Sequence, residues 1–158
     1  MRKSASIGLL LVILAMTGTA FAQRGTAETT INGKTVAIDY GRPSLQGRDM
    51  LGRLPVGQSW RMGMNAATTL TTQAPLRFGD LQVPVGKHTL TLKRISEDSF
   101  HLVITPDGGS PTEVPVETMK LDDPVETLTM GLESQGDNRG HFGLSWGTLA
   151  IGTDFAVE

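Results

Sequence analysis

Apolar and polar residues alternate in short runs along most of this chain, and a repeat of two residues is the signature of a β-strand with one buried face. In residues 34–40, for example, the apolar side chains Val36, Ile38 and Tyr40 fall on one face. The same kind of pattern predicts further strands at residues 26–31, 68–72, 76–78, 81–83, 88–95, 100–105, 127–133, 141–146 and 148–157, and residues 60–65 alternate in the same way. A helical period is not sustained over the length of a core helix. The sequence therefore predicts an all-β protein.

Turn residues separate these predicted strands and indicate how neighbouring strands connect. Asn32-Gly33 stands between residues 26–31 and 34–40, and this dipeptide tolerates the two positive φ angles of a type I′ hairpin turn. Gly79-Asp80 separates another pair of strands in the same way. Roughly eight to ten short strands with closely spaced turns predict an antiparallel two-sheet β-sandwich or a jelly-roll-like fold.

The first 22 residues have the pattern of a secretory signal peptide. Arg2 and Lys3 precede an apolar run at residues 7–16, and the small residues of Ala20-Phe21-Ala22 mark a cleavage site. The apolar run is shorter than the roughly 20 residues that cross a bilayer, so stable membrane insertion is not expected. We therefore expect one domain at residues 23–158, in the periplasm or outside the cell. The chain has no cysteine, which excludes disulfides and thiolate metal sites.

Charge is distributed unevenly along the chain. Removal of residues 1–22 takes away Arg2 and Lys3 but no acid, so the formal net charge changes from −2 to −4. This balance argues against a nucleic-acid partner. Residues 41–67 are nevertheless locally basic, with four arginines against one aspartate, and residues 113–137 are strongly acidic. Either region can steer a charged partner, or the two are solvated faces that partly neutralise each other.

The basic region includes the least strand-like part of the chain, residues 41–58. Pro43 fixes its own φ and favours an extended conformation at Arg42. We expect this segment to form a long, ordered, arginine-rich crossover loop with one helical turn near residues 49–53.

The arginines of this region have two alternative roles. Guanidinium groups are planar and permanently charged and can fork onto carboxylates or phosphates, so several on one loop can form an anion clamp. Alternatively, they tie the loop to the sheet by donating to backbone carbonyls and to acids such as Asp39 or Asp49. The candidate ligand-binding residues are Arg42, Arg48, Trp60, Arg61 and Asn65.

Residues 143–147 read Gly-Leu-Ser-Trp-Gly, the G-x-S-x-G of a hydrolase nucleophile elbow. That elbow requires a helix after the serine and a histidine later in the chain. Here a second strand is predicted to follow, and no histidine occurs after His141. We interpret Ser145 as an outward residue between two inward ones.

Metal-binding residues show no recognisable spacing. His88, His101 and His141 do not match a zinc site, and solvent-facing or edge positions suit them better. Met62 and Met64 offer soft sulfur ligands for Cu(I), but core or rim packing explains them equally well. No metal and no cofactor is predicted.

The arginine motifs resemble those of a bacterial family of exported proteins known as domain of unknown function family 2911. The family pattern runs Y-x-R-P-x-x-x-G-R and then W-R-x-G-x-N-x-A-T. The chain matches it at Tyr40, Arg42, Pro43, Gly47, Arg48, Trp60, Arg61, Gly63, Asn65, Ala67 and Thr68. It departs at His88, where the family usually has tyrosine, and at Ala66, where glutamate is frequent. The resemblance implies a secreted or periplasmic β-rich domain and no established activity.

Convergent donors beside an aromatic side chain are typical of a small-ligand site. The preferred hypothesis is therefore a non-catalytic exported β-sandwich that binds a small polar or anionic ligand or a glycan of the cell envelope. One alternative is a hydrolase acting on envelope material, for which the sequence offers no defensible base and nucleophile. The other is a structural or protein-interaction domain whose arginines support the fold.

Overall fold

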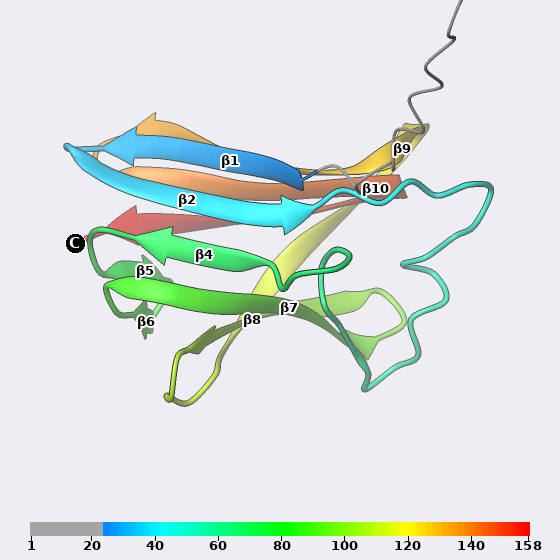
Figure 1. Ribbon diagram of the computed structural model, residues 1–158, viewed down its shortest axis with the longest axis horizontal. Coiled ribbons are helices and arrows are strands. Elements are labelled where there is room, and N and C mark those ends of the chain that lie inside the picture. The colour runs from blue at the N-terminus through cyan, green and yellow to red at the C-terminus, as the bar shows by residue number, and fades with distance from the viewer. Residues whose placement is uncertain (1–23) are drawn as a thin grey trace, which may run out of the picture.

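A computed structural model describes residues 24–158, and its regular elements are all strands (Figure 1). They are β1 (Arg24–Ile31), β2 (Lys34–Gly41), β3 (Ser59–Trp60), β4 (Thr69–Thr72), β5 (Leu76–Phe78), β6 (Leu81–Val83), β7 (Gly86–Ser96), β8 (Ser99–Pro106), β9 (Thr112–Gly136) and β10 (Arg139–Val157). The predicted signal peptide at residues 1–22 lies outside the described residues. In the part of the chain that is described, no helix has the length and apolar character needed to cross a membrane.

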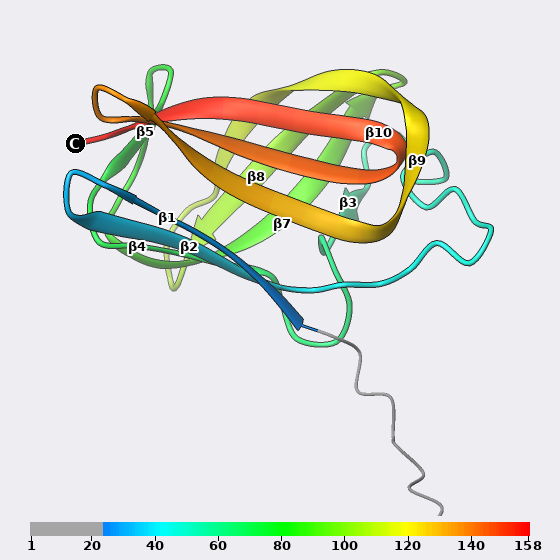
Figure 2. The same ribbon diagram turned by 90° about the horizontal axis from the view of Figure 1, so that it is seen from above.

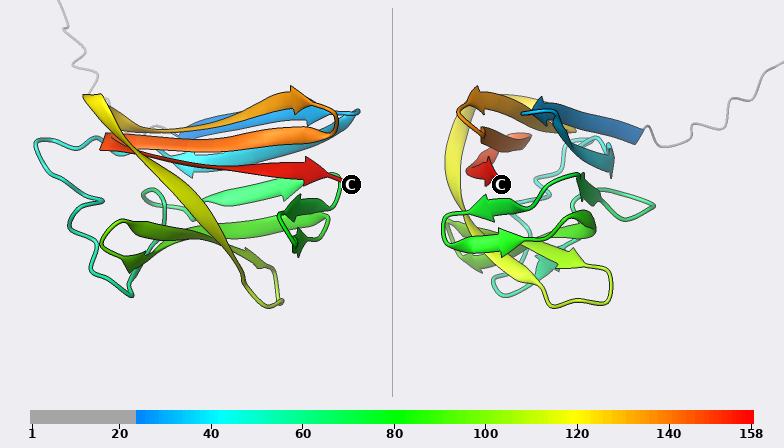
Figure 3. Two further views of the ribbon diagram at one scale, coloured as in Figure 1. Left: turned by 180° about the vertical axis from the view of Figure 1, so that it is seen from behind. Right: turned by 90° about the vertical axis from the view of Figure 1, so that its left-hand side faces the viewer.

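The strands pair in the order β1-β2-β4-β7-β8-β9-β10-β5-β6, and β3 pairs with β7. Every pairing is antiparallel. The sheet curves so strongly that its two parts face each other, as the right-hand view of Figure 3 shows. The predicted all-β antiparallel fold is confirmed, and the facing layers are consistent with a sandwich.

The two hairpins predicted from their turn residues are confirmed. β1 pairs with β2 along its whole length, and Asn32 and Gly33 have φ angles of 50° and 74°, as a type I′ turn requires. β5 and β6 pair on either side of Gly79-Asp80. The turn residues alone were therefore sufficient to predict both hairpins.

β9 is much longer than the alternation predicts. The strand predicted at residues 127–133 is only its second half. The first half includes Pro115 and Pro124 and many exposed acids. The sequence pattern does not reveal a strand there, because proline donates no hydrogen bond to a neighbouring strand and polar residues occupy both faces.

β10 combines the two strands predicted at residues 141–146 and 148–157. Figure 2 shows it doubling back at one end, where Gly147 has a φ of 63°. Its first half pairs with the second half of β9, and its second half pairs with residues 117–120 of β9. The two halves of β10 lie side by side, and residues of both halves line one hollow.

The apolar faces of the two layers meet in a single core. One small internal space is lined by Leu70, Leu90 and Leu102 from β4, β7 and β8 and by Leu132, Phe142 and Phe155 from β9 and β10. The residues predicted to point inward from the first half of β10, Phe142, Leu144 and Trp146, are all buried. Burial of this shared face is the main force holding the layers together.

His88 lies in the core, so its predicted solvent-facing or edge position is wrong. It is 2% exposed and shares the inward face of β7 with Leu90 and Leu92. Its Nε2 lies 2.7 Å from the Pro84 carbonyl oxygen, and its Nδ1 has no hydrogen-bond partner. The alternation of the strand outweighs the polarity of the side chain here. His101, by contrast, is partly exposed, as predicted.

Candidate functional site

The start of the arginine-rich loop lies along β9. Leu128 N donates to the carbonyl oxygen of Pro43, and Leu45 N donates to that of Glu126, each over 3.0 Å. An isolated bridge pairs Ser44 with β9 between these contacts. The loop therefore joins β2 to β9 through backbone hydrogen bonds, which the local pattern of the sequence does not reveal.

Tyr40 and Arg42 stabilise this contact between the loop and β9. The Tyr40 hydroxyl accepts a 2.9 Å hydrogen bond from Met130 N. Arg42 Nε donates to the Leu128 carbonyl oxygen at 3.1 Å, and its Nη2 donates to Thr129 Oγ1 at 3.3 Å. Arg42 is half-buried and has partners inside the protein, which is the arrangement expected of a structural arginine.

Arg48 lies further along the loop, in its exposed part. Its Nε donates to the Leu45 carbonyl oxygen at 3.3 Å. The helical turn predicted at residues 49–53 is wrong, because this segment forms turns without a helix. The Asp49 side chain instead accepts a 2.9 Å hydrogen bond from Gly52 N, a local contact that competes with helix formation.

Arg94 of β7 holds the second part of the loop, and sequence reasoning missed it. Its Nη1 donates to the carbonyl oxygens of Gly52 at 3.1 Å and Leu54 at 2.7 Å. It also donates to two carbonyls of its own β7–β8 hairpin. The sequence marks Arg94 only as one more residue of a strand, so no local signal distinguishes it.

Trp60 in β3 packs against Trp146 of β10. Its ring stacks on that of Trp146 in β10, with centroids 5.3 Å apart and planes inclined by 20°. Trp146 is buried and donates its Nε1 hydrogen to the Glu126 carbonyl oxygen at 3.1 Å. Trp60 remains half-buried, so one part of it supports the fold and another part faces the surroundings.

Arg61 and Asn65 are brought together in one tight loop. Arg61 Nη2 donates to the Asn65 carbonyl oxygen, and Thr68 Oγ1 donates to that of Met62 at 2.7 Å. Met62 and Asn65 have positive φ angles of 56° and 64°, which breaks the alternation predicted for residues 60–65. Met62 is fully buried and packs in the core.

The crossover loop at residues 41–58 and the tight turn at residues 61–65 together form the arginine-rich loop region, whose arginines have no carboxylate partners in the described part of the chain. The two acids expected to pair with them are engaged elsewhere, since Asp39 pairs with Arg24 and Asp49 with Gly52 N. Within residues 24–158, no ion pair involves Arg42, Arg48, Arg53 or Arg61. The loop therefore carries positive charge that no contact neutralises.

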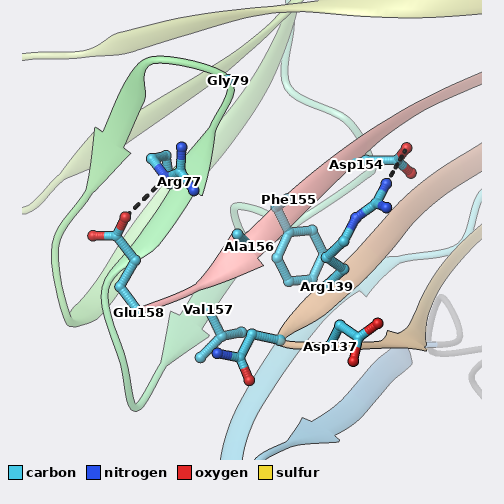
Figure 4. A pocket seen from close by; sticks show the side chains of 10 residues that line it. Arg77, Gly79, Asp137, Arg139, Asp154, Phe155, Ala156, Val157 and Glu158 are labelled. Atoms are coloured by element: carbon cyan, nitrogen blue, oxygen red, sulfur yellow. Dashed lines mark hydrogen bonds and ion pairs between the residues drawn. The ribbon is translucent and has the colours of Figure 1, made fainter.

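A hollow of about 540 Å³ lies elsewhere, between the β9–β10 turn, the end of β10 and β5 (Figure 4). Arg77 and Glu158 form an ion pair there at 2.8 Å, and Arg139 and Asp154 lie 3.8 Å apart. These arginines, unlike those of the loop, are neutralised by neighbouring carboxylates.

A second hollow, of about 510 Å³, lies on the outer face of β10 and includes His141 and Ser145. His141 Nδ1 is 2.7 Å from Asp154 Oδ1. Ser145 follows His141 by four positions in the strand, which places their Cα atoms about 13 Å apart. The histidine therefore does not reach the serine hydroxyl, and the geometry gives the hydrolase elbow no support.

The acidic and histidine side chains of residues 24–158 include no group of three that could hold a metal ion. The pairs His101–Glu113, at 2.9 Å, and His141–Asp154 are separate contacts. Sequence spacing could not reveal either pair, because His101 and Glu113 lie on the paired strands β8 and β9, and His141 and Asp154 lie on the two halves of β10, which meet only in the folded sheet.

Comparison with known proteins adds an identification at the level of the family. A family model described as a protein of unknown function (DUF2911) matches residues 22–155. No curated protein and no solved structure matches the chain. Because the matched range covers most of the chain and both arginine motifs, the chain belongs to the DUF2911 family of proteins of unknown function.

Proposed function

We propose that this protein is an exported, non-catalytic module that binds a polar or anionic ligand of the cell envelope at its arginine-rich loop. The main support is that Arg48 and Arg61 are exposed and have no carboxylate partner within residues 24–158, whereas the exposed Arg77 has one. Unneutralised guanidinium groups attract anions and can bind them through two parallel N–H groups. Export rests on the signal-peptide pattern of residues 1–22.

In this proposal, one arginine supports the fold and two bind the ligand. Arg42 donates twice to β9 and anchors the loop. Arg48 uses only its Nε, and Arg61 uses only one Nη2 contact, in hydrogen bonds within residues 24–158. The other N–H groups of Arg48 and Arg61 are therefore free to bind a ligand, with Asn65 and the exposed part of Trp60 as neighbours in the sequence motif.

The expected affinity follows from the exposure of these groups. An exposed ion pair contributes about 0.2–1 kcal/mol, so the two free arginines supply at most about 2 kcal/mol, which corresponds to a Kd of roughly 30 mM. A ligand with several negative charges is therefore required for tighter binding, and its affinity should fall as salt is added.

Isothermal titration of the purified protein tests the proposal with citrate, inorganic phosphate and a glycerol phosphate oligomer as probes. The double variant Arg48→Gln/Arg61→Gln should weaken binding by about tenfold, equivalent to about 1.4 kcal/mol. The matched control Arg77→Gln/Arg139→Gln removes the same charge from the neutralised hollow and should retain most of the affinity. Equal losses in the two variants, or no binding of any probe to the parent protein, would overturn the proposal.

A further inference from the structure

We propose a second binding site, for a neutral carbohydrate, on the outer face where β9 and β10 pair. Alternate residues of the two strands stand directly opposite each other there: Thr129 with Ser145, Gly131 with Gly143, and Glu133 with His141. They surround a hollow of about 390 Å³. This hollow shares its His141, Gly143 and Ser145 with the 510 Å³ hollow on the same face, so together they form one extended groove.

His141 presents an oriented hydrogen-bonding group to this groove. Because the Asp154 carboxylate accepts from Nδ1 at 2.7 Å, the proton of the neutral ring is on Nδ1 and Nε2 is an acceptor. Nε2 faces the floor of the groove, since a Cβ atom built on Gly152 would lie 2.9 Å from it and one built on Gly143 would lie 3.8 Å away. Asp154 thus fixes the ring in a position to bind a ligand hydroxyl.

Two further polar side chains at the rim are free. Glu133 and Ser145 make no side-chain hydrogen bond to other residues in the range 24–158. The Thr129 hydroxyl is held in place, because it donates to the Thr127 carbonyl oxygen at 2.9 Å and accepts from Arg42. The groove therefore offers unsatisfied groups from both strands beside an oriented histidine.

Glycine backbone forms the floor of the groove, although the fold has room for side chains at these positions. A Cβ atom on Gly131 would meet nothing within 4 Å, and one on Gly143 would make only ordinary contacts of 3.8–4.0 Å. Neither glycine is among the residues with positive φ. Glycine weakens a strand interior and often marks a place where a ligand approaches the backbone closely. The two glycines keep open the space that the polar rim surrounds.

The surrounding groups select the class of ligand. Neither hollow of the groove is lined by lysine or arginine, and Glu117 and Glu133 are acidic, so an anion would be repelled. Sugar hydroxyls can donate to Glu133 and His141 Nε2 and accept from Ser145. Met119, which is 63% exposed at the edge of the groove, offers an apolar contact for the C–H face of a sugar ring. This site and the proposed anion site are independent of each other.

The experiment titrates the purified protein with the trimer of N-acetylglucosamine, cellotriose and maltotriose while backbone amide signals are followed by NMR. At least one sugar should shift the amide signals of Gly131 and Gly143. The variants Gly131→Val and Gly143→Val fill the floor with a side chain that strands favour, so each should weaken sugar binding about tenfold, equivalent to about 1.4 kcal/mol. Their thermal midpoints should equal or exceed that of the parent, which excludes unfolding as the cause.

Several results would overturn this inference. Sugar binding that survives both valine substitutions would place the ligand elsewhere, and no binding of any of the three sugars would remove the carbohydrate assignment. Glucosamine is titrated as a cationic comparison, and a response to it without a response to the neutral sugars would assign a cationic ligand instead. If Arg48→Gln/Arg61→Gln lost sugar binding while both valine variants still bound sugar, the sugar site would be at the arginine loop. The proposed function would then be unaffected. Anion binding lost and sugar binding retained in that double variant would support two separate sites.

Discussion

The backbone of Gly41 lies directly against that of Met64, so closely that a Cβ atom at position 41 would overlap the Met64 carbonyl oxygen. On the other side of the contact, a Cβ atom on Gly63 would lie 3.0 Å from the Gly41 carbonyl oxygen. The two arginine motifs are therefore packed backbone to backbone, although the crossover loop separates them in the sequence.

Gly41→Ala should lower the free energy of unfolding by about 2–4 kcal/mol, because backbone on both sides of the contact must move. Urea denaturation measures the loss. Gly131→Ala is the matched control, since its Cβ atom meets no neighbour, and it should leave stability unchanged or slightly higher. Similar losses in the two variants would show that close packing at Gly41 does not matter.

Arg94→Met should loosen the arginine-rich loop. The change removes the donors to the carbonyl oxygens of Gly52 and Leu54, at a cost of about 1–3 kcal/mol in the free energy of unfolding. Limited proteolysis should then cleave within residues 50–58 faster than in the parent. Arg53→Met, at an exposed arginine of the same loop, should change neither quantity, and equal proteolysis of the two variants would contradict the anchoring role of Arg94.

Trp60→Ala should cost about 2–3 kcal/mol of unfolding free energy, because it removes the stack on Trp146 together with partly buried apolar area. Chemical denaturation followed by circular dichroism measures the change. Val56→Ala, at a residue that is 58% exposed, should lie within about 0.5 kcal/mol of the parent. A Trp60 variant as stable as the Val56 variant would rule out a packing role for the stack.

Lysine substitutions should separate the arginines that support the fold from those that we propose bind a ligand. Arg42→Lys should lower the free energy of unfolding by about 1–2 kcal/mol, because the lysine ammonium lacks the rigid planar fork with which Arg42 donates to both Leu128 and Thr129. Arg48→Lys and Arg61→Lys should each stay within about 0.5 kcal/mol of the parent. Losses above about 2 kcal/mol in the latter two would favour arginines that serve only the fold.

Glu113 makes stability depend on pH in the acid range. The hydrogen bond from His101, and next that from Lys93, holds the pKa of the Glu113 carboxyl below its usual 4.5. A depressed carboxyl pKa contributes stability that is fully present above the unfolded value and is lost as pH falls through the folded value. The carboxylate is partly exposed, so its contribution at pH 7 is less than about 1 kcal/mol.

Urea denaturation of the parent and of Glu113→Gln between pH 7 and pH 3 measures this contribution. The difference in unfolding free energy between them should be constant at neutral pH and should shrink below about pH 4.5. Glu117→Gln, at an exposed acid on the same strand, serves as the control and should follow the parent curve throughout. A difference for Glu113→Gln that grows on acidification would have the wrong sign for a stabilised carboxylate.

Local patterns decided a large part of the fold. The type I′ turn at Asn32-Gly33, the β5–β6 hairpin and the inward faces of β2 and β10 all follow from residues close together in the chain. The same alternation also placed His88 inward, against the expectation drawn from its polarity. The arginine motifs were visible as motifs, but their division into anchors and free donors was not.

Only the tertiary structure decided the contacts between segments that are not neighbours along the chain. Alternation determines which face of a strand a residue occupies, because that depends only on neighbours two positions away. It does not determine which segment of the chain lies alongside, so the hydrogen bonds of Arg94 to the loop carbonyl of Leu54 and of His141 to Asp154 had no signal in the sequence. The sequence by itself determined an all-β chain with a basic loop, and the curvature of the sheet and the doubling back of β10 decided where its polar groups meet.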